Sequence, residues 1–494
     1  MVSEELLELA HKIEAQKAET QTVEVKAAHQ GCPKRLYDTL SSFSNQDAGG
    51  IILFGLDESK NFEIVGVYDL QDLQKKVTEQ CNQMVPPVRA VFTTADCGGN
   101  YICSAEIPST DISERPCYYS GTGRTKGAYV RVGDADLPMT DFEIYNYEVF
   151  RRHLHDDERI VERAGMSLMD TAKIQTYLLR MQAERPGFSQ LTAKQAYEML
   201  AITRDGKLTL AAVLNFALYP QGFFPQLAVT AIVVAGKEIG ETSRDGARFV
   251  NNKRIEGTLQ GMLSESLSFC LRNMKTKTVI DPQTGERTDK PEYPIEAIRE
   301  AILNALIHRD YSHFTEGTPI QINFFTDRLE IHSPGGLYGR MTVEDLGKAK
   351  PDLRNPALAS MSEFLLNTEN RYSGIPTIRR EMKALGLKEP VFINRRNEFV
   401  VILYNEPEIV VSNTPEQGKK EPSEEKLLEF CRMPRSRSEI AEFLGIRTIH
   451  YATQHYIQPL VKNGQLIMTI PDKPKSKNQK FISQSTSETG YDQV

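Results

Sequence analysis

The stretch from Glu300 to Tyr311 constrains the fold more than any other part of this chain. Apolar residues at 298, 302, 303, 306 and 307 recur at steps of three and four, which predicts a helix with one buried stripe. Glu300, Asn304 and His308, the polar ridge, stand four residues apart and line up along another face of that helix. Because such groups are costly to bury without polar partners, the ridge predicts contact with a polar ligand. The alternative is a structural helix whose amide and imidazole satisfy backbone groups.

A glycine-rich corner follows this helix. Residues 320–325 and 328–332 predict two strands, and the letters SPGGL at 333–337 predict a tight corner after the second. Glycine has no Cβ, so the backbone at 335–336 can approach a ligand closely.

The segments EAILNALIHRDY, DRLEIHSPGGL, DLRNPALA and RYSGIPTIRREM resemble the ATP-binding module of the GHKL class, in the divergent form that follows Schlafen/AlbA-type domains in prokaryotic regulators. The resemblance implies that Glu300 activates water and that Asn304 holds Mg²⁺. It also implies a set of further nucleotide contacts, namely His308, Asp310, Gly335, Gly336, Arg354, Asn355 and Gly374. Ser333 stands where the class carries an adenine-reading Asp, and the second glycine box is reduced to SGI at 373–375. We therefore expect poor adenine selectivity or slow turnover.

Length and composition narrow the class of protein. A chain of 494 residues predicts three or four domains, and 40% hydrophobic with 25% charged residues is typical of globular proteins. No apolar run approaches the roughly 18 residues of a membrane span. The acidic N-terminus is unlike a signal peptide, and seven cysteines without a C-x-x-C pair favour a reducing cytoplasm over a structural zinc site. With a net charge of −7, nucleic-acid binding must rely on local basic patches.

Residues 1–148 predict an α+β domain with helices over 34–43 and 70–84 and a buried strand over 51–56. The words ETQTVEVK, SSFSNQDAGGIILFGLDE, FEIVGV and GAYVRVGD resemble the AlbA-type domain of the Schlafen family. The resemblance implies a metal-dependent nuclease site made of Glu19, Glu24 and Asp57, with Lys26 beside them. Mg²⁺ or Mn²⁺ there would polarise a phosphodiester and activate water.

Two alternatives to cleavage remain open for this domain. It could bind phosphates through basic residues, namely Lys26, Lys34, Arg35, Arg124, Lys126 and Arg131, or it could be purely structural. Animal Schlafens use paired lobes and a zinc site, whereas this sequence has one lobe and no zinc ligands. Cleavage would therefore need a second copy, which favours a homo-oligomer such as a dimer.

Residues 149–290 predict a connector and lead-in to the ATP module at 291–412. We expect an exposed charged connector over 151–162, a strand over 228–234, a long helix over 252–271 and a loop over 276–290. No stretch matches the P-loop pattern G-x-x-x-x-G-K-[ST], so the sequence gives no support for a P-loop helicase.

Residues 421–483, after a polar linker, predict helices over 424–431, 436–444 and 447–460 and a hairpin over 466–482. This order resembles a winged helix-turn-helix. Residues 423–482 hold ten basic and six acidic residues, which favours DNA. The expected nucleic-acid contacts are Arg447, Thr448, Tyr451, Gln454, Lys473, Lys475, Lys477 and Lys480. Dimerisation, or packing onto the ATP module, is the alternative use.

The sequence thus predicts an α+β multidomain protein: an AlbA/Schlafen-type domain, a GHKL-like α/β sandwich and a winged helix-turn-helix. The first functional hypothesis is a DNA-binding transcriptional regulator modulated by ATP, with duplex DNA as partner and RNA as another candidate. The second is a Schlafen-like metal-dependent nuclease in phage defence or stress response. The third is a scaffold with a degenerate nucleotide site.

Overall fold

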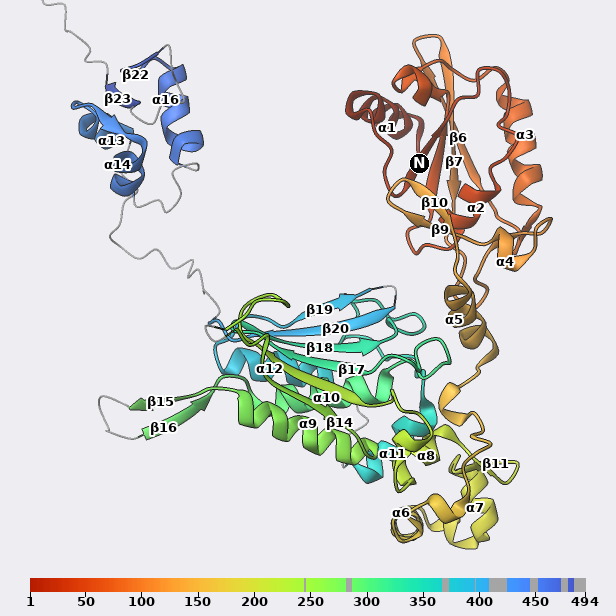
Figure 1. Cartoon of the computed structure of the whole chain (residues 1–494). Helices are drawn as coiled ribbons and strands as arrows, with labels where there is room; N and C mark the ends of the chain where they lie inside the picture. Colours follow the sequence, from red (N-terminus) through yellow and green to blue (C-terminus); the bar gives the residue numbers. More distant parts are fainter. Residues whose placement is uncertain are drawn as a thin grey trace, which may run out of the picture. The chain divides into compact units, whose positions relative to one another are not determined.

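The structure is a computed structural model that describes residues 1–243, 246–280, 287–366, 373–395, 397–407, 424–444, 452–471 and 479–483. It divides into two compact units, residues 1–409 and 410–494. Both units combine helices with sheets, which confirms the predicted α+β multidomain class (Figure 1). Among the described residues, no helix is both long and apolar enough to cross a membrane.

The N-terminal part is built on a four-stranded sheet between two apolar layers. Its strands, in spatial order, are β1 (Val23–Lys26), β2 (Gly50–Phe54), β7 (Asn100–Ile107) and β6 (Val91–Cys97). Side chains of β2 alternate between its faces. Ile52 and Phe54 pack with α2 (Tyr37–Ser44) and α3 (Leu70–Cys81), whereas Leu53 packs with α1 (Ser3–Gln16).

Smaller elements complete this part. The hairpin of β9 (Tyr129–Val132) and β10 (Ala135–Pro138) packs on α2. Strand β8 (Tyr118–Tyr119) and helix α4 (Arg124–Gly127) both contact α2. Helix α5 (Asp141–Arg152) contacts α4. The strand predicted over 51–56 is interrupted, because Gly55 has φ +104° and separates β2 from β3 (Leu56–Asp57).

The predicted exposed connector over 151–162 is partly wrong. Asp157, in the short helix η2 (Asp156–Glu158), is completely buried and accepts a hydrogen bond of 2.9 Å from the amide of Leu358. That amide lies in the first turn of α11 (Pro356–Leu365), where helix amides lack partners within the helix. The carboxylate therefore anchors the segment to the module, and burial raises its pKa to about 7.

Several helices follow η2 in the chain, before the first strand of the central sheet. The longer ones are α6 (Thr171–Glu184), α7 (Ala193–Met199) and α8 (Leu210–Phe216). Their apolar residues belong to the same hydrophobic core as the sheet that follows, so this region packs continuously with the module.

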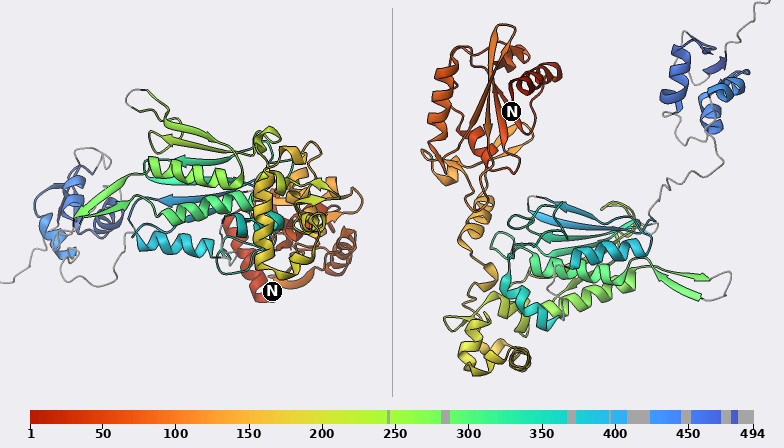
Figure 2. Two further views of the ribbon diagram at one scale, coloured as in Figure 1. Left: turned by 90° about the horizontal axis from the view of Figure 1, so that it is seen from below. Right: turned by 180° about the vertical axis from the view of Figure 1, so that it is seen from behind.

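A six-stranded sheet forms the centre of the first unit. In spatial order it contains β14 (Phe249–Ile255), β13 (Val229–Val234), β17 (Ile320–Phe324), β18 (Arg328–Pro334), β20 (Glu398–Tyr404) and β19 (Val391–Asn394). Three helices cover one face of it: α9 (Leu259–Asn273), α10 (Ile295–His308) and α12 (Gly374–Ala384) (Figures 1 and 2). Two strands thus come from the segment that we predicted as a lead-in.

Two predictions for that segment are wrong. The helix expected over 252–271 begins at Leu259, because residues 249–255 form the edge strand β14 and the Thr258 side chain caps the helix. The loop expected over 276–290 contains β15 (Thr276–Ile280) and β16 (Arg287–Pro291), which pair antiparallel (Figure 2). Thr, Val and Ile dominate β15, and these β-branched residues favour strands.

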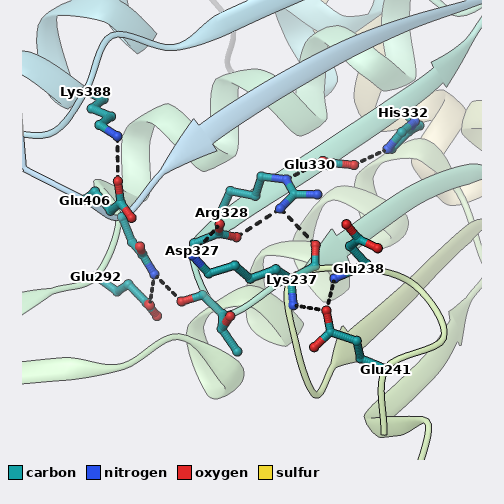
Figure 3. A network of polar contacts seen from close by, with 12 residues as sticks. Lys237, Glu238, Glu241, Glu292, Asp327, Arg328, Glu330, His332, Lys388 and Glu406 are labelled. Carbon is teal, nitrogen blue, oxygen red and sulfur yellow. Dashed lines mark hydrogen bonds and ion pairs between the residues drawn. The ribbon is translucent and has the colours of Figure 1, made fainter. Parts of the chain in front are cut away.

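The face of the sheet away from the helices is polar. Arg328, Glu330 and His332 alternate along β18 and form a chain of ion pairs (Figure 3). Glu330 accepts from Arg328 at 2.6 Å and lies 2.9 Å from His332. Leu329, Ile331 and Ser333 point to the opposite face, where the Ser333 hydroxyl donates to the Ala305 carbonyl of α10. This alternation fixes the register of β18 beneath α10.

The second unit has its own small core. Its described helices are α13 (Glu424–Phe430), α14 (Arg437–Phe443), the π-helix η6 (Thr453–Ile457) and α16 (Gln458–Lys462). A three-stranded sheet orders β21 (Arg435–Ser436), β23 (Lys480–Ser483) and β22 (Leu466–Met468). Because β22 pairs antiparallel with β23, the two strands of the predicted hairpin are confirmed.

Candidate functional sites

A pocket opens between α10, the end of β18 and the start of α12. Its polar lining comes from the ridge and the corner, namely Glu300, Asn304, His308, Ser333, Gly335, Gly336, Asp352, Arg354, Ser373 and Gly374. The predicted polar ridge therefore faces one cavity. The reason is that the apolar stripe of α10, with Ile298 and Ile302 fully buried, packs into the core.

Two groups of the ridge lack protein partners. Within the described part of the chain, neither the Asn304 amide nor the His308 imidazole makes a hydrogen bond. His308 is enclosed by surrounding protein yet exposes its surface to the pocket. That enclosure, with the nearby Arg354 cation, lowers the pKa of His308 to about 4. The imidazole is therefore neutral at pH 7 and offers one donor and one acceptor.

The start of α12 abuts the other two ridge residues. A Cβ built on Gly374 would lie 3.0 Å from the Asn304 amide nitrogen and 3.1 Å from a Glu300 carboxylate oxygen. Ser373 provides no side-chain cap for this helix. Pro376 has no N–H, and the Thr377 amide donates to the Ser373 carbonyl. The first-turn amides that an anion could reach are therefore those of Gly374 and Ile375. Glu300 itself pairs with Arg299 at 2.7 Å, and burial raises its pKa.

The glycine corner requires glycine. Gly335 has φ +90°, and a Cβ there would lie 2.3 Å from the Arg354 guanidinium and 2.4 Å from Asp310 Cβ. Arg354 also donates to the Gly336 carbonyl at 3.1 Å, and His155 contacts the Arg354 carbonyl at 3.2 Å. Arg354 therefore holds the corner in place while it lines the pocket.

Two predicted nucleotide contacts do not line the pocket. Asn355 is buried and donates to the carbonyls of Ile307 and Arg309, both at 2.8 Å, which caps the end of α10. Asp310 is also buried, and its carboxylate accepts from the Ser312 amide and lies 3.7 Å from Arg354. Both residues position the ridge and the corner.

The apolar wall of the pocket was not predicted. It comes from Leu337, Tyr338, Met341, Ile375, Phe399 and Val401. Alternation along β20 could have revealed Phe399 and Val401, since both point to the helix-covered face. No local sequence pattern marked Tyr338, because its contacts are distant in the chain. The Arg354 guanidinium lies 5.2 Å from the centre of its ring, and the Phe150 ring centre lies 5.5 Å away.

The pocket fits magnesium only together with a phosphorylated ligand. Among the described residues, no three His, Cys, Asp or Glu side chains gather as a metal-binding group. Mg²⁺ in nucleotide sites commonly takes one or two protein oxygens and completes its shell with phosphates and water. The free Asn304 amide, with Glu300 beside it, provides such a partial set of ligands.

The N-terminal acid cluster is built differently, because its cation belongs to the chain. One amino group of Arg131 lies 2.7 Å from Glu24 and 3.0 Å from Asp136, and the other lies 3.6 Å from Glu19. Lys26 also pairs with Glu24. The Arg131 side chain is 1% exposed, so it cannot bind phosphates as we had suggested.

Asp57 lies outside this cluster. Its carboxylate accepts from the Ser59 amide at 3.0 Å and hydroxyl at 2.6 Å and caps a short helix. The expected metal site of Glu19, Glu24 and Asp57 does not form in the structure, since Arg131 supplies the positive charge that the two glutamates need. Burial, with the neighbouring Glu24 charge, raises the pKa of Glu19 to about 7.

The predicted contacts of the second unit are mostly outside the described residues. These are Arg447, Thr448, Tyr451, Lys473, Lys475 and Lys477, together with the side chain of Gln454. Lys480 is described, and it is exposed on β23. The expected groove contact of this unit therefore stays a prediction.

Three family models match separate parts of the chain. Residues 19–140 match "Schlafen, AlbA_2", and residues 317–403 match "Putative ATP-dependent DNA helicase recG C-terminal". Residues 425–482 match the C-terminal domain of "Filamentation induced by cAMP protein Fic-like". Residues 19–140 are thus similar to the AlbA_2 domain of the Schlafen family. The central part of the chain carries an ATPase-like module, and the two segments support a nucleic-acid-binding protein.

Two solved structures are also similar. One is the DIP2311 protein from Corynebacterium diphtheriae, at 19% identity and a TM-score of 0.39, with 97% of each chain covered. The other is the N-terminal domain of a "Putative ATP-dependent DNA Helicase RecG-related Protein" from Nitrosomonas europaea. It is 24% identical with a TM-score of 0.23, covering 27% of this chain and 93% of that one. No curated protein matches the chain.

Proposed function

We propose that this protein is a DNA-binding transcriptional regulator whose central pocket binds Mg²⁺-ATP as an effector. The observation that carries the proposal is the polar ridge: Asn304 and His308 face an open pocket without protein partners. Because no group of the described residues pairs with them, a ligand in the pocket can pair with both, and a ligand that binds only the folded state stabilises the protein.

Each wall of the pocket has a role in this proposal. The amides at the start of α12 and the Arg354 guanidinium receive phosphate oxygens. The Asn304 oxygen would help to hold the Mg²⁺ that accompanies the phosphates. At the other end, the Ser333 hydroxyl donates a hydrogen bond to the Ala305 carbonyl, so its lone pairs remain to accept a hydrogen bond from an amino group.

In this proposal ATP acts by binding to the pocket and not by being hydrolysed. The Glu300 carboxylate is paired with Arg299 at 2.7 Å, and this ion pair engages one of the two oxygens that could orient water. Binding energy alone is sufficient for an effector, because a ligand shifts an equilibrium by its different affinity for two states.

DNA is bound, in this proposal, by residues 421–483 through the basic residues around 473–480. The nuclease alternative is not favoured, because Arg131 occupies the centre of the acid cluster that a metal would need. We do not propose a helicase activity, since the sequence contains no P-loop.

The test is duplex affinity measured with and without Mg²⁺-ATP. We expect the affinity of the full chain to change when ATP is added, and Lys475→Ala with Lys477→Ala to weaken binding at every sequence. Each lost phosphate contact should reduce the log–log salt slope by about 0.9. Equal duplex affinity with and without ATP would overturn regulation by ATP, and unchanged affinity of the lysine variant would move the DNA site elsewhere.

A further inference from the structure

A surface of the N-terminal part combines stacked tyrosines with basic side chains. The tyrosine–arginine surface comprises Arg35, Tyr37, Tyr119, Arg124, Lys126 and Arg151. Arg35 precedes α2, and the other residues come from the start of α2, from β8, from α4 and from the end of α5. Helix α4 contacts β8, α2 and α5, and β8 contacts α2. They are separated by up to 116 positions in the chain (151 − 35), so the surface exists only in the fold.

The aromatic centre of the surface is a parallel pair. The rings of Tyr37 and Tyr119 stack at a centroid distance of 3.7 Å with an interplanar angle of 16°. Both rings are half-buried, so part of the pair is open to solvent. Gly121 adjoins the Tyr119 hydroxyl end, where a Cβ would lie 2.6 Å from the ring. The pair therefore offers a flat, held platform onto which another planar ring can stack.

Cations surround this platform. Arg35 is 63% exposed and contacts the Tyr129 hydroxyl at 3.4 Å, and Lys126 is exposed on α4. Arg124 lies over Tyr118, the neighbour of Tyr119, at 5.5 Å.

One carboxylate on α5 is shared by several arginines. Glu148 pairs with Arg124, with Arg151 at 3.0 Å and with Arg152 at 3.5 Å. Asp38 pairs with Arg35 at 2.9 Å. Basic side chains therefore outnumber acidic ones here, although the whole chain carries −7.

We propose that the tyrosine–arginine surface binds single-stranded nucleic acid. This rests on the proposed nucleic-acid function and assigns a second, different site for it. Unpaired bases present free faces that stack on aromatic rings, while nearby cations contact the phosphates. A duplex keeps its base faces covered, so the platform discriminates in favour of single strands.

The experiment measures fluorescence anisotropy of the full chain with labelled oligo-dT, oligo-U and a duplex of equal length, each of about 20 nucleotides. Tyr119→Leu should weaken single-strand binding about 5- to 150-fold, the range of one lost base–aromatic stack. Arg35→Ala with Lys126→Ala should lower the single-strand salt slope by about 1.4, from two lost phosphate contacts. Lys12→Ala, an exposed lysine on α1 of the same part, is the matched control and should change neither.

The outcomes separate the two proposals. Loss of single-strand affinity with unchanged duplex affinity supports the surface. If the parent chain binds single strands and the variants bind equally well, the surface is wrong while nucleic-acid binding stands. A parent chain that binds neither form overturns both. Stronger binding to oligo-U than to oligo-dT would assign the surface to RNA.

Discussion

The acid cluster of the N-terminal part and the polar ridge of the module look alike in the sequence but differ in the fold. The ridge was predicted from the four-residue spacing of its polar residues, and the acid cluster from the resemblance to Schlafen nucleases. In the acid cluster, Glu19 and Glu24 meet a buried guanidinium, Arg131. On the ridge, Asn304 and His308 meet no protein group among the described residues and face a pocket. The cluster is therefore satisfied internally, whereas the ridge is available to a ligand.

This difference teaches that a polar residue indicates a binding site only when the fold leaves it unpaired. Buried ions need compensation, and the compensating group can come from the chain itself or from a ligand. Arg131 enters the acid cluster from a hairpin more than 100 positions away from Glu24. No local sequence pattern predicts that pairing.

The largest expected effect comes from removing the internal cation. Arg131→Leu leaves the Glu24, Asp136 and Glu19 carboxylates buried beside one another, and breaking a buried pair costs about 3–5 kcal/mol. Urea unfolding at pH 7 should show this loss. Arg35→Ala, an exposed arginine of the same part, should change the free energy of unfolding by less than about 0.5 kcal/mol. A loss below 1 kcal/mol for Arg131→Leu would mean that the cluster does not depend on its arginine.

The next largest effect is a loss of stability at the pocket, where Arg354 packs over the glycine corner. Gly335→Ala should cost about 2–4 kcal/mol, because positive φ costs about 1–2 kcal/mol and the new methyl would overlap Arg354. Gly386→Ala is the matched control, since Gly386 has φ +70° but no atom within 4 Å of the built Cβ. Unfolding of the two variants in urea should therefore differ by the overlap alone. Equal losses would show that Arg354 moves aside freely.

The smallest effect is a pH dependence within the acid cluster. The pKa of Glu19 is raised by burial to about 7, above its ordinary value of 4.5. A carboxyl with a raised folded-state pKa contributes stability that is present below pH 4.5 and lost as the pH rises through 7. Glu19→Gln keeps the acceptor for the Val25 amide, so it should match the parent protein near pH 5 and exceed its stability at pH 8. Greater stability of the parent at pH 8 would show that Arg131 favours the ionised form.

Local patterns predicted the helix of the ridge well. The apolar steps around Ile302 and the four-residue spacing of the ridge are properties of one helix, so they need no distant information. The strand predicted over 328–332 and the hairpin strands predicted for the second unit also form.

Distant pairings could not be predicted from local patterns. Asp157 lies in a charged run that reads as exposed, yet it is buried as a cap for α11, about 200 positions later. Strand β14 carries polar residues on both faces because it lies at the sheet edge, so no periodicity marked it. Asp310 and Asn355 were predicted as nucleotide contacts, but they bond backbone groups and position the ridge instead. Sequence patterns identified which groups gather, and the fold decided which of them stay free.

The most direct test of the central claim is the thermal stability of Asn304→Ala with and without Mg²⁺-ATP. The parent protein should gain about 2.7 kcal/mol at a free ligand concentration about 100 times the dissociation constant. Asn304→Ala should lose that gain with a nearly unchanged ligand-free melting temperature, because its amide bonds no described residue. Glu296→Ala, eight residues earlier on the same helix and exposed, should keep the gain. A parent protein that gains nothing from millimolar Mg²⁺-ATP would contradict the account and make the ridge part of a degenerate scaffold.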